Sequence, residues 1–250
     1  MKKLIFYLFF LNINLAASAQ EQNISEFKPS NIVKFLPLSL PFNSISFEYE
    51  RMISAKNSIS MEIGIPDKKS IIGKYGIPIN SDLKTAEFSV SALRGAFRHY
   101  TGKKSLPKGF YIEPYFKYQH LEGKASIDGV DNQGDNYSGK SDINFNTINI
   151  GCQLGFQFLI AKRISLDLYF LGLEGGLING NITTTPTSYT EYDPIILGVL
   201  KNVIDQKISE APSIIRNNVS TTVTQNSILL KAHNVPYPWY RGGISIGFVF

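Results

Sequence analysis

Histidine is the residue type most able to act as a general base, and His120 is the best placed of the three histidines in this chain. His120 precedes Glu122 by two residues and Ser126 by six, so a base, an acid and a hydroxyl share one segment. A serine hydrolase needs its histidine between a serine and a carboxylate, and this spacing does not provide that arrangement. His99 and His233 lie far from His120 in the sequence. We therefore expect a protein without catalytic residues, with a lipid-modifying enzyme that uses His120 as the alternative.

The aspartates between Asp128 and Asp142 are the nearest approach to a metal site. Their spacing lacks the alternating ligands and the terminal glutamate of an EF-hand, so we interpret them as part of a solvated loop. The single cysteine, Cys152, excludes a disulfide framework and fits an outward strand position. The sequence predicts neither a metal nor a cofactor.

Charged residues at alternate positions of apolar segments form a second chemically capable group. Glutamates, arginines and their partners share the parity of the polar strand face, which predicts that they point inward together. Nearly balanced buried charges are expected to pair, because an unpaired buried charge is costly. We predict a salt-bridged interior network, with a proton or ion path as the alternative reading, made of Glu48, Glu50, Glu62, Arg94, Arg98, Glu113, Lys117, Asp167 and Arg241.

Alternation with a period of two recurs from residue 44 to the C-terminus and predicts β-strands. The clearest case is 147–158, where Ile148, Ile150 and Phe156 alternate with Asn149, Gln153 and other polar residues. We expect eight strands, at 31–40, 44–53, 57–65, 86–100, 109–121, 143–160, 164–180 and 239–250. The first is the weakest, since it contains Pro37.

Strand length and connection length favour a membrane barrel over a soluble sandwich. Several of these strands exceed the five or six residues that are common in soluble sheets. Short links (54–56, 101–108, 161–163) alternate with long ones (66–85, 122–142, 181–238), as in outer-membrane barrels. The predicted fold is all-β, an eight-stranded antiparallel up-and-down transmembrane β-barrel. Pro114 is a local violation, because a closed barrel leaves no free edge for a residue without an N–H.

The long extracellular loop, 181–238, is expected to contain a helix and a hairpin. Asp193-Pro194 is a helix start and Pro212 ends the helix, while 219–231 predicts a hairpin. The apolar stripe of the helix needs a surface to cover it, which can be the barrel mouth, the outer leaflet or a partner protein. The stripe that could contact a partner consists of Ile196, Leu200, Val203 and Ile204.

The N-terminus has the pattern of a cleaved signal peptide over 1–19. Lys2 and Lys3 precede an apolar run, and Ala17-Ser18-Ala19 follows it. We expect a periplasmic segment at 20–30 and the barrel at 31–250, with the mature protein in the outer membrane. The net charge of +5 is too small and too dispersed to indicate nucleic-acid binding.

Two motifs carry a family resemblance. The first is Asn31-Ile-Val-Lys34 followed by Ser46-Phe-Glu-Tyr-Glu-Arg51, and the second is Pro236-Tyr-Pro-Trp239 followed by 241–250, which ends in Phe248 and Phe250. With these motifs the chain resembles the small outer-membrane β-barrel proteins of Bacteroidota. Ser245 departs from the pattern of the terminal assembly signal, where glycine is common.

The resemblance implies a barrel in the outer membrane and brings no site residues with it. We expect a non-enzymatic structural protein or an accessory subunit of a larger outer-membrane assembly. Its expected partners are membrane lipid and lipopolysaccharide, the barrel-assembly machinery, and other outer-membrane proteins. The alternative is an enzyme similar to the lipid A deacylases.

Overall fold

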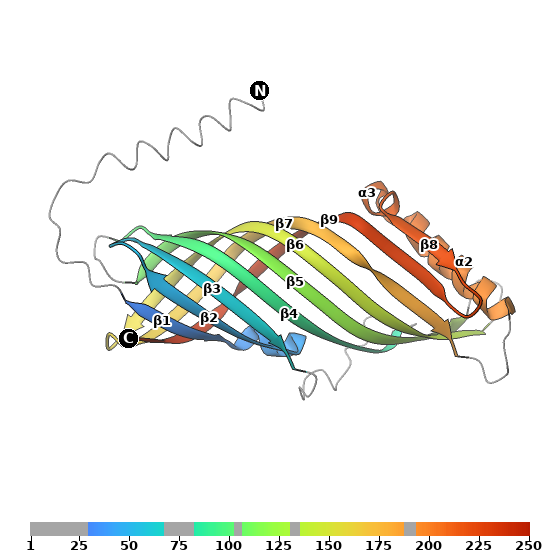
Figure 1. Ribbon diagram of the computed structural model, residues 1–250, viewed down its shortest axis with the longest axis horizontal. Coiled ribbons are helices and arrows are strands. Elements are labelled where there is room, and N and C mark those ends of the chain that lie inside the picture. The colour runs from blue at the N-terminus through green and yellow to red at the C-terminus, as the bar shows by residue number, and fades with distance from the viewer. Residues whose placement is uncertain (1–29, 68–82, 103–106, 131–135, 188–193) are drawn as a thin grey trace, which may run out of the picture.

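The computed structural model describes residues 30–67, 83–102, 107–130, 136–187 and 194–250, and these form an all-β fold. The signal-peptide segment 1–19 and all but Ser30 of the segment 20–30 lie outside the described residues. Eight antiparallel strands form a ring (Figure 1). They are β1 (Asn31–Leu36), β2 (Ser44–Met52), β3 (Asn57–Pro66), β4 (Leu83–Tyr100), β5 (Gly109–Val130), β6 (Asn136–Ile160), β7 (Ile164–Pro186) and β9 (Ile228–Val249).

The ring closes where the first strand meets the last. Neighbouring strands pair in chain order as far as β7, then β7 pairs with β9, and β9 pairs with β1 over Ile32–Phe35 and Ile246–Val249. Asn31 and Phe250 exchange backbone hydrogen bonds of 3.0 and 2.9 Å at the end of this seam. The chain ends of the ring therefore lie together, as Figure 1 shows for β1 and the C-terminus.

Alternation gives the ring a polar inner face and an apolar outer face. In β2 the buried residues include Ser46, Glu48 and Glu50, whereas Phe47 and Tyr49 between them are 47% and 41% exposed. The same division holds in β6, where Gln153 and Gln157 are buried and Ile150 is 69% exposed. Successive strand residues point to opposite faces, so the sequence pattern is sufficient to direct each side chain.

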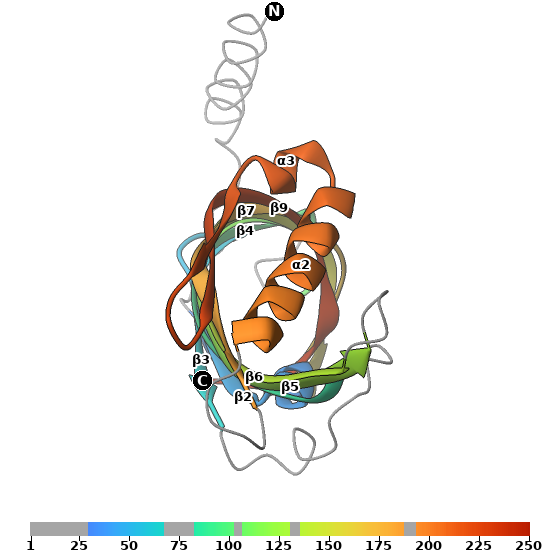
Figure 2. The same cartoon turned by 90° about the vertical axis from the view of Figure 1, so that its right-hand side faces the viewer.

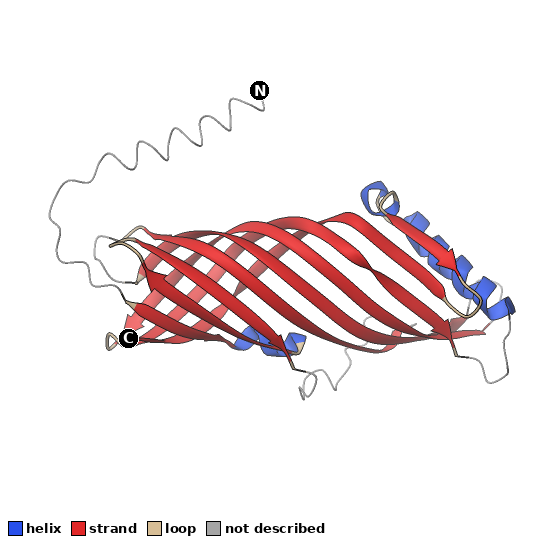
Figure 3. Cartoon of the chain, in the orientation of Figure 1, coloured by secondary structure: helices blue, strands red, loops and turns tan. Residues whose placement is uncertain are grey.

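The longest strands extend well beyond their expected ends. β5, β6 and β7 continue into 122–130, 136–142 and 181–186, which we had expected to be loop. β9 starts at Ile228 rather than at residue 239, so the second arm of the expected hairpin is the start of the last ring strand. Figure 3 shows these strands running past the short β1–β3 side of the ring.

Two prolines behave differently from one another. β1 ends at Leu36, and a 3-10 helix, η1 (Pro37–Phe42), replaces the rest of the expected first strand. Pro114 stays inside β5, opposite Cys152 of β6. Its missing N–H coincides with a break in the β4–β5 pairing between Ala96 and His99. The sheet thus accommodates Pro114 by omitting part of one ladder.

Helices and a short strand stand at the end of the ring far from the termini. α2 (Pro194–Glu210) matches the expected helix, and it is followed by α3 (Ser213–Arg216) and β8 (Val219–Val223), whose one partner among the described strands is β9. α2 lies across the opening of the ring in the end-on view (Figure 2) and contacts β6, β7, β8 and β9. In the described part of the chain, no helix has the length and hydropathy that a membrane-spanning helix requires.

Candidate functional site

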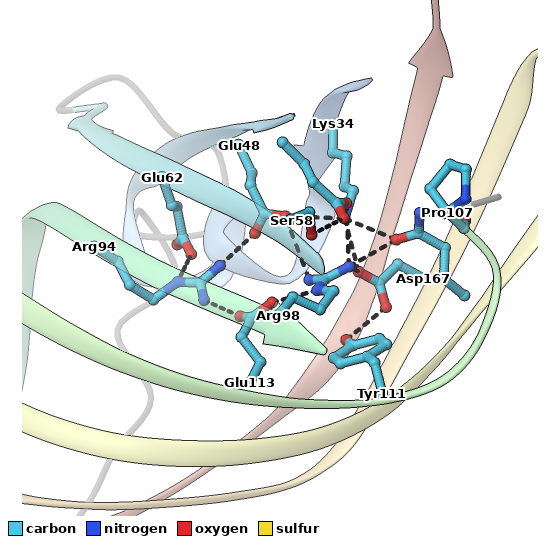
Figure 4. A network of polar contacts seen from close by, with 12 residues as sticks. Lys34, Glu48, Ser58, Glu62, Arg94, Arg98, Pro107, Tyr111, Glu113 and Asp167 are labelled. Atoms are coloured by element: carbon cyan, nitrogen blue, oxygen red, sulfur yellow. Dashed lines mark hydrogen bonds and ion pairs between the residues drawn. The ribbon is translucent and has the colours of Figure 1, made fainter. Parts of the chain in front are cut away.

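Arg98 is the centre of a network of charged side chains inside the ring (Figure 4). The fully buried guanidinium donates to Asp167 at 2.9 Å and to Gln157 at 2.7 Å, and it also binds Glu113. A further contact joins it to Glu50 at 3.2 Å. One arginine of β4 therefore connects side chains of β2, β5, β6 and β7.

Two other cations complete this network, which we call the lower network. Arg94 lies two inward positions from Arg98 along β4 and donates to Glu62 at 2.7 Å, with further ion pairs to Glu48 and Glu113. Lys34 of β1 has no exposed surface and lies 2.9 Å from Glu48, 2.7 Å from Glu50 and 3.0 Å from Asp167. Each carboxylate named here contacts at least one cation.

Neutral side chains satisfy the remaining carboxylate oxygens. Ser58 and Tyr100 both donate to Glu50, each at 2.6 Å. Tyr111 donates to Asp167 at 2.7 Å, and the Gln153 amide donates to Glu113 at 3.0 Å. A buried ion network is tolerated only when such hydrogen bonds complete it.

A second group lies toward the helix-bearing end of the ring. Glu174 of β7 accepts from Lys117 at 2.5 Å and from the Tyr115 hydroxyl at 2.9 Å. Arg241 of β9 binds Glu62 at 2.7 Å, and its guanidinium lies 4.9 Å from the centre of the Tyr169 ring. Glu62 thereby links this group to the lower network through Arg94.

The lower network closes the interior at its level. Arg94, Arg98, Glu50, Glu113 and Lys34 are each at most 1% exposed. An eight-stranded ring is just wide enough for its own side chains to fill. Charges held this tightly by opposite charges act as a fixed plug, and removing any one of them takes one charge partner from each of its buried neighbours.

The structure brings all nine sequence-predicted network residues into this interior. Lys117 lies with Glu174, and the other eight belong to the chain of contacts from Asp167 to Arg241. Sequence reasoning missed Lys34 and Glu174. Lys34 is the third cation at Glu48, and Glu174 is the partner of Lys117. Lys34 is buried with Ile32 and Leu36 on the inner face of β1, whose six residues are too few for the alternation to be recognised in the sequence.

His120 lies on the outer face of β5, beyond Tyr118, where the outward residues become polar. Its Nδ1 is 2.9 Å from Asn146 Oδ1, which also accepts from the Tyr118 hydroxyl, and its Nε2 is 3.2 Å from Glu122. The hydrogen bond to Glu122 is the main cause that raises the pKa of His120 above its usual value. Both ring nitrogens thus have an oxygen acceptor within hydrogen-bond distance, an arrangement that favours the protonated form of the imidazole.

The serines near His120 do not share its hydrogen bonds. Ser126 is six residues along the same strand, roughly 20 Å away at the usual rise of a strand. Ser91 is the Cα partner of His120 on β4, but the ring nitrogens contact Asn146 and Glu122 instead. His233, which we had placed in a loop, is part of β9, and His99 contacts Asn57 at the opposite end of the ring.

The remaining predicted residues are at the two ends of the molecule. On α2, Val203 and Ile204 are half-buried, whereas the side chains of Ile196 and Leu200 lie outside the described part. Phe248 and Phe250 at the C-terminus are 52% and 63% exposed on the outer face.

Comparisons with known proteins place no family name on this arrangement. No family model matches the chain, and neither a curated protein nor a solved structure is significantly similar to it.

Proposed function

We propose that the ring is an outer-membrane β-barrel whose apolar outer face lies in the bilayer. Large outward side chains are exposed on the ring strands, among them Met61, Phe97, Phe116, Ile150, Leu173 and Phe248. Soluble monomers rarely expose a continuous apolar surface of this size. Backbone pairing around the ring satisfies most of the peptide groups that lipid could not, as a membrane-spanning sheet requires, and one edge of β9 between residues 232 and 246 is the exception.

The two ends of the ring differ in the way that distinguishes periplasm from exterior. Asn31, Phe250 and the turn 161–163 lie at one end, whereas long strand extensions, α2, α3 and β8 stand at the other. Short periplasmic turns and long external loops are the rule for such barrels. In this orientation Phe248 and Phe250 end the last strand at the periplasmic side, as an assembly signal for the barrel-assembly machinery would.

The plugged interior carries the rest of the proposal: the protein works through its external surfaces, as a structural protein or as an accessory subunit. Arg98 and its partners leave no exposed side-chain surface at their level, which is unsuitable for a diffusion pore. The described extracellular part contains exposed apolar side chains with no function in the ring, namely Ile214, Ile215 and Val223. Lipopolysaccharide surrounds the outer face in this proposal.

The contact surface that we infer for a partner is the edge of β8 away from β9. No described strand pairs with this edge, and α2 and α3 contact β8. Asn218 O accepts from His233 N and Thr224 N donates to Ser227 O, so residues 220 and 222 form the ladder with β9. Val219, Thr221 and Val223 then turn their N–H and C=O groups away from the sheet. The strand has no charged residue and no proline, the devices that usually protect an edge. An extended segment of a partner protein can add to it as a strand.

A second copy in the same membrane does not fit this edge. β8 runs antiparallel to β9, so it shares the tilt of the barrel wall, about 35–45° from the barrel axis in such proteins. Antiparallel pairing of two β8 strands would invert one copy relative to the bilayer. Parallel pairing would need strands without tilt, because the facing edges of two barrels in the same orientation tilt in opposite directions. The occupant is therefore a different protein.

Replacing Thr221 by proline is expected to remove the partner and to preserve the fold. Proline eliminates one N–H at the free edge without removing a hydrogen bond to β9. The measurement is gentle detergent extraction from the native cell, followed by native mass determination of the complex. Thr221→Ala, which keeps the N–H, is the matched control and should retain the partner. A complex that survives Thr221→Pro, or that is lost equally in Thr221→Ala, would contradict the proposed contact.

A further inference from the structure

Above the ionic plug the inner face of the ring changes from charged to apolar. The inward residues of the strand extensions form a set that we call the upper interior set: Val90, Leu121, Phe145, Ile178, Tyr237 and Trp239. Val90, Leu121 and Phe145 are successive cross-strand partners on β4, β5 and β6. Outward residues at the same height, such as Asn144 and Glu122, are polar. The inside-out pattern of the lower ring is thus reversed here.

This set is not packed to completion. Its first five members are half-buried and Trp239 is 52% exposed, although all six point to the inside of the ring. Trp239 is stacked on Tyr237 with ring centres 5.2 Å apart. The Lys117–Glu174 pair lies beneath, with Glu174 directly across from Trp239 on β7, and α2 lies over the mouth above. Apolar surface with a few polar groups at one end is the usual lining of a small-molecule site.

Beside Trp239, β9 has no strand partner on the side away from β7. Below, β9 pairs with β1 from residue 246, and above, it pairs with β8 up to residue 232. Between these points no described strand pairs with this edge, and η1, which follows β1, contacts β9. The Asn31–Phe250 hydrogen bonds show that the even-numbered residues of β9 direct their backbone N–H and C=O groups toward this edge. Pro236 and Pro238 occupy two such positions while their registers with β7 remain intact. The prolines prevent an added strand from closing the wall here.

We infer that the upper interior set binds the hydrocarbon chain of a membrane lipid, which reaches it through the open edge of β9. Outside this edge, Tyr240 and Ile244 continue the apolar outer face, so apolar surface is continuous from the bilayer to Trp239. The lipid headgroup stays at the membrane surface, and the chain displaces water from Phe145, Ile178 and their neighbours. Burial of that surface is the driving force. Binding of the lipid chain rests on the proposed position of the ring in the bilayer and involves no step of bond making.

Trp239 is the only tryptophan, so its fluorescence reports on this site directly. The full mature chain is refolded into two kinds of vesicle, and the fluorescence of Trp239 is compared between them. One kind consists of phospholipid with brominated acyl chains, and the other is unbrominated and supplied with dibromostearic acid. We expect brominated phospholipid to quench Trp239, and Phe145→Arg to lose most of that quenching, because the arginine introduces charge among the apolar side chains. In Asn144→Arg, one residue away and outward, Trp239 should be quenched as strongly as in the unmodified protein.

A milder variant, Leu121→Gln, protects the test against misfolding and should also reduce the quenching. Circular dichroism and resistance to heat in detergent establish that each variant is folded. Equal quenching in Phe145→Arg, Leu121→Gln and Asn144→Arg would overturn the inference, since Trp239 would then contact only the surrounding bilayer. Quenching by dibromostearic acid without quenching by brominated phospholipid would contradict the inference that the bound chain belongs to a membrane lipid.

Discussion

Replacing Arg98 by methionine is expected to lower the free energy of unfolding by about 3–5 kcal/mol, the usual cost of breaking a buried ion pair. Methionine keeps much of the side-chain volume and removes the cation that Glu113, Asp167 and Glu50 share. Lys34 still compensates two of these carboxylates, but Glu113 keeps only Arg94. The loss of charge pairing, rather than of packing, should dominate.

Reversible refolding into lipid vesicles, followed by urea titration, measures this cost. Arg51→Met is the matched control, because Arg51 is on β2 of the same ring but points outward and is exposed. It should change the free energy of unfolding by less than about 1 kcal/mol, as surface charges do. Equal effects of the two substitutions would mean that the plug does not contribute to stability.

Replacing Leu154 by arginine is expected to cost about 2–4 kcal/mol in a bilayer, which is typical of an arginine at the midplane of a barrel's lipid face. Leu154 is central in the outward run of β6 between Ile148 and Ile160. Asn144→Arg, on the same strand and also outward, lies beyond the apolar band and should cost little. The measurement is the same refolding titration. A harmless Leu154→Arg, or an equally costly Asn144→Arg, would be inconsistent with a bilayer around this band.

The strand ends show where sequence patterns stop being informative. Within the apolar band, alternation located strands such as β2 and β3 to within a residue. Above it, the outward residues of β5 and β6 become polar, as at Lys124 and Asn144, while glycine and alanine interrupt the inward ones, so the contrast between the faces is weak and reversed. Hydrophobic periodicity detects a strand only where its two faces meet different environments.

The two missed members of the network have separate physical causes. Lys34 belongs to a strand of six residues, which is too short for a convincing pattern and is followed by Pro37. Glu174 follows a β-bulge in β7, between Tyr169 and Gly172. The additional residue shifts the inward parity from odd, as at Asp167, to even, so extrapolation from Asp167 placed Glu174 outside.

The candidate site could be predicted only in part for a related reason. Parity alone assigned Arg94, Arg98 and Glu113 to the interior, but it could not determine which charges touch. The open β9 edge was also beyond sequence reasoning, because Pro236 and Pro238 indicate the end of a strand unless the missing neighbour is known.

Labelling of single cysteines on intact cells tests the outer-membrane barrel most directly. In a Cys152→Ser background, which removes the only cysteine, Asn202→Cys puts a thiol on exposed α2 and Lys162→Cys puts one in the exposed β6–β7 turn. We expect a membrane-impermeant thiol reagent to label residue 202 on intact cells, and residue 162 only after the outer membrane is broken. Labelling of residue 162 alone on intact cells, of both positions, or of neither until the cells are lysed would contradict a barrel that spans the outer membrane in this orientation.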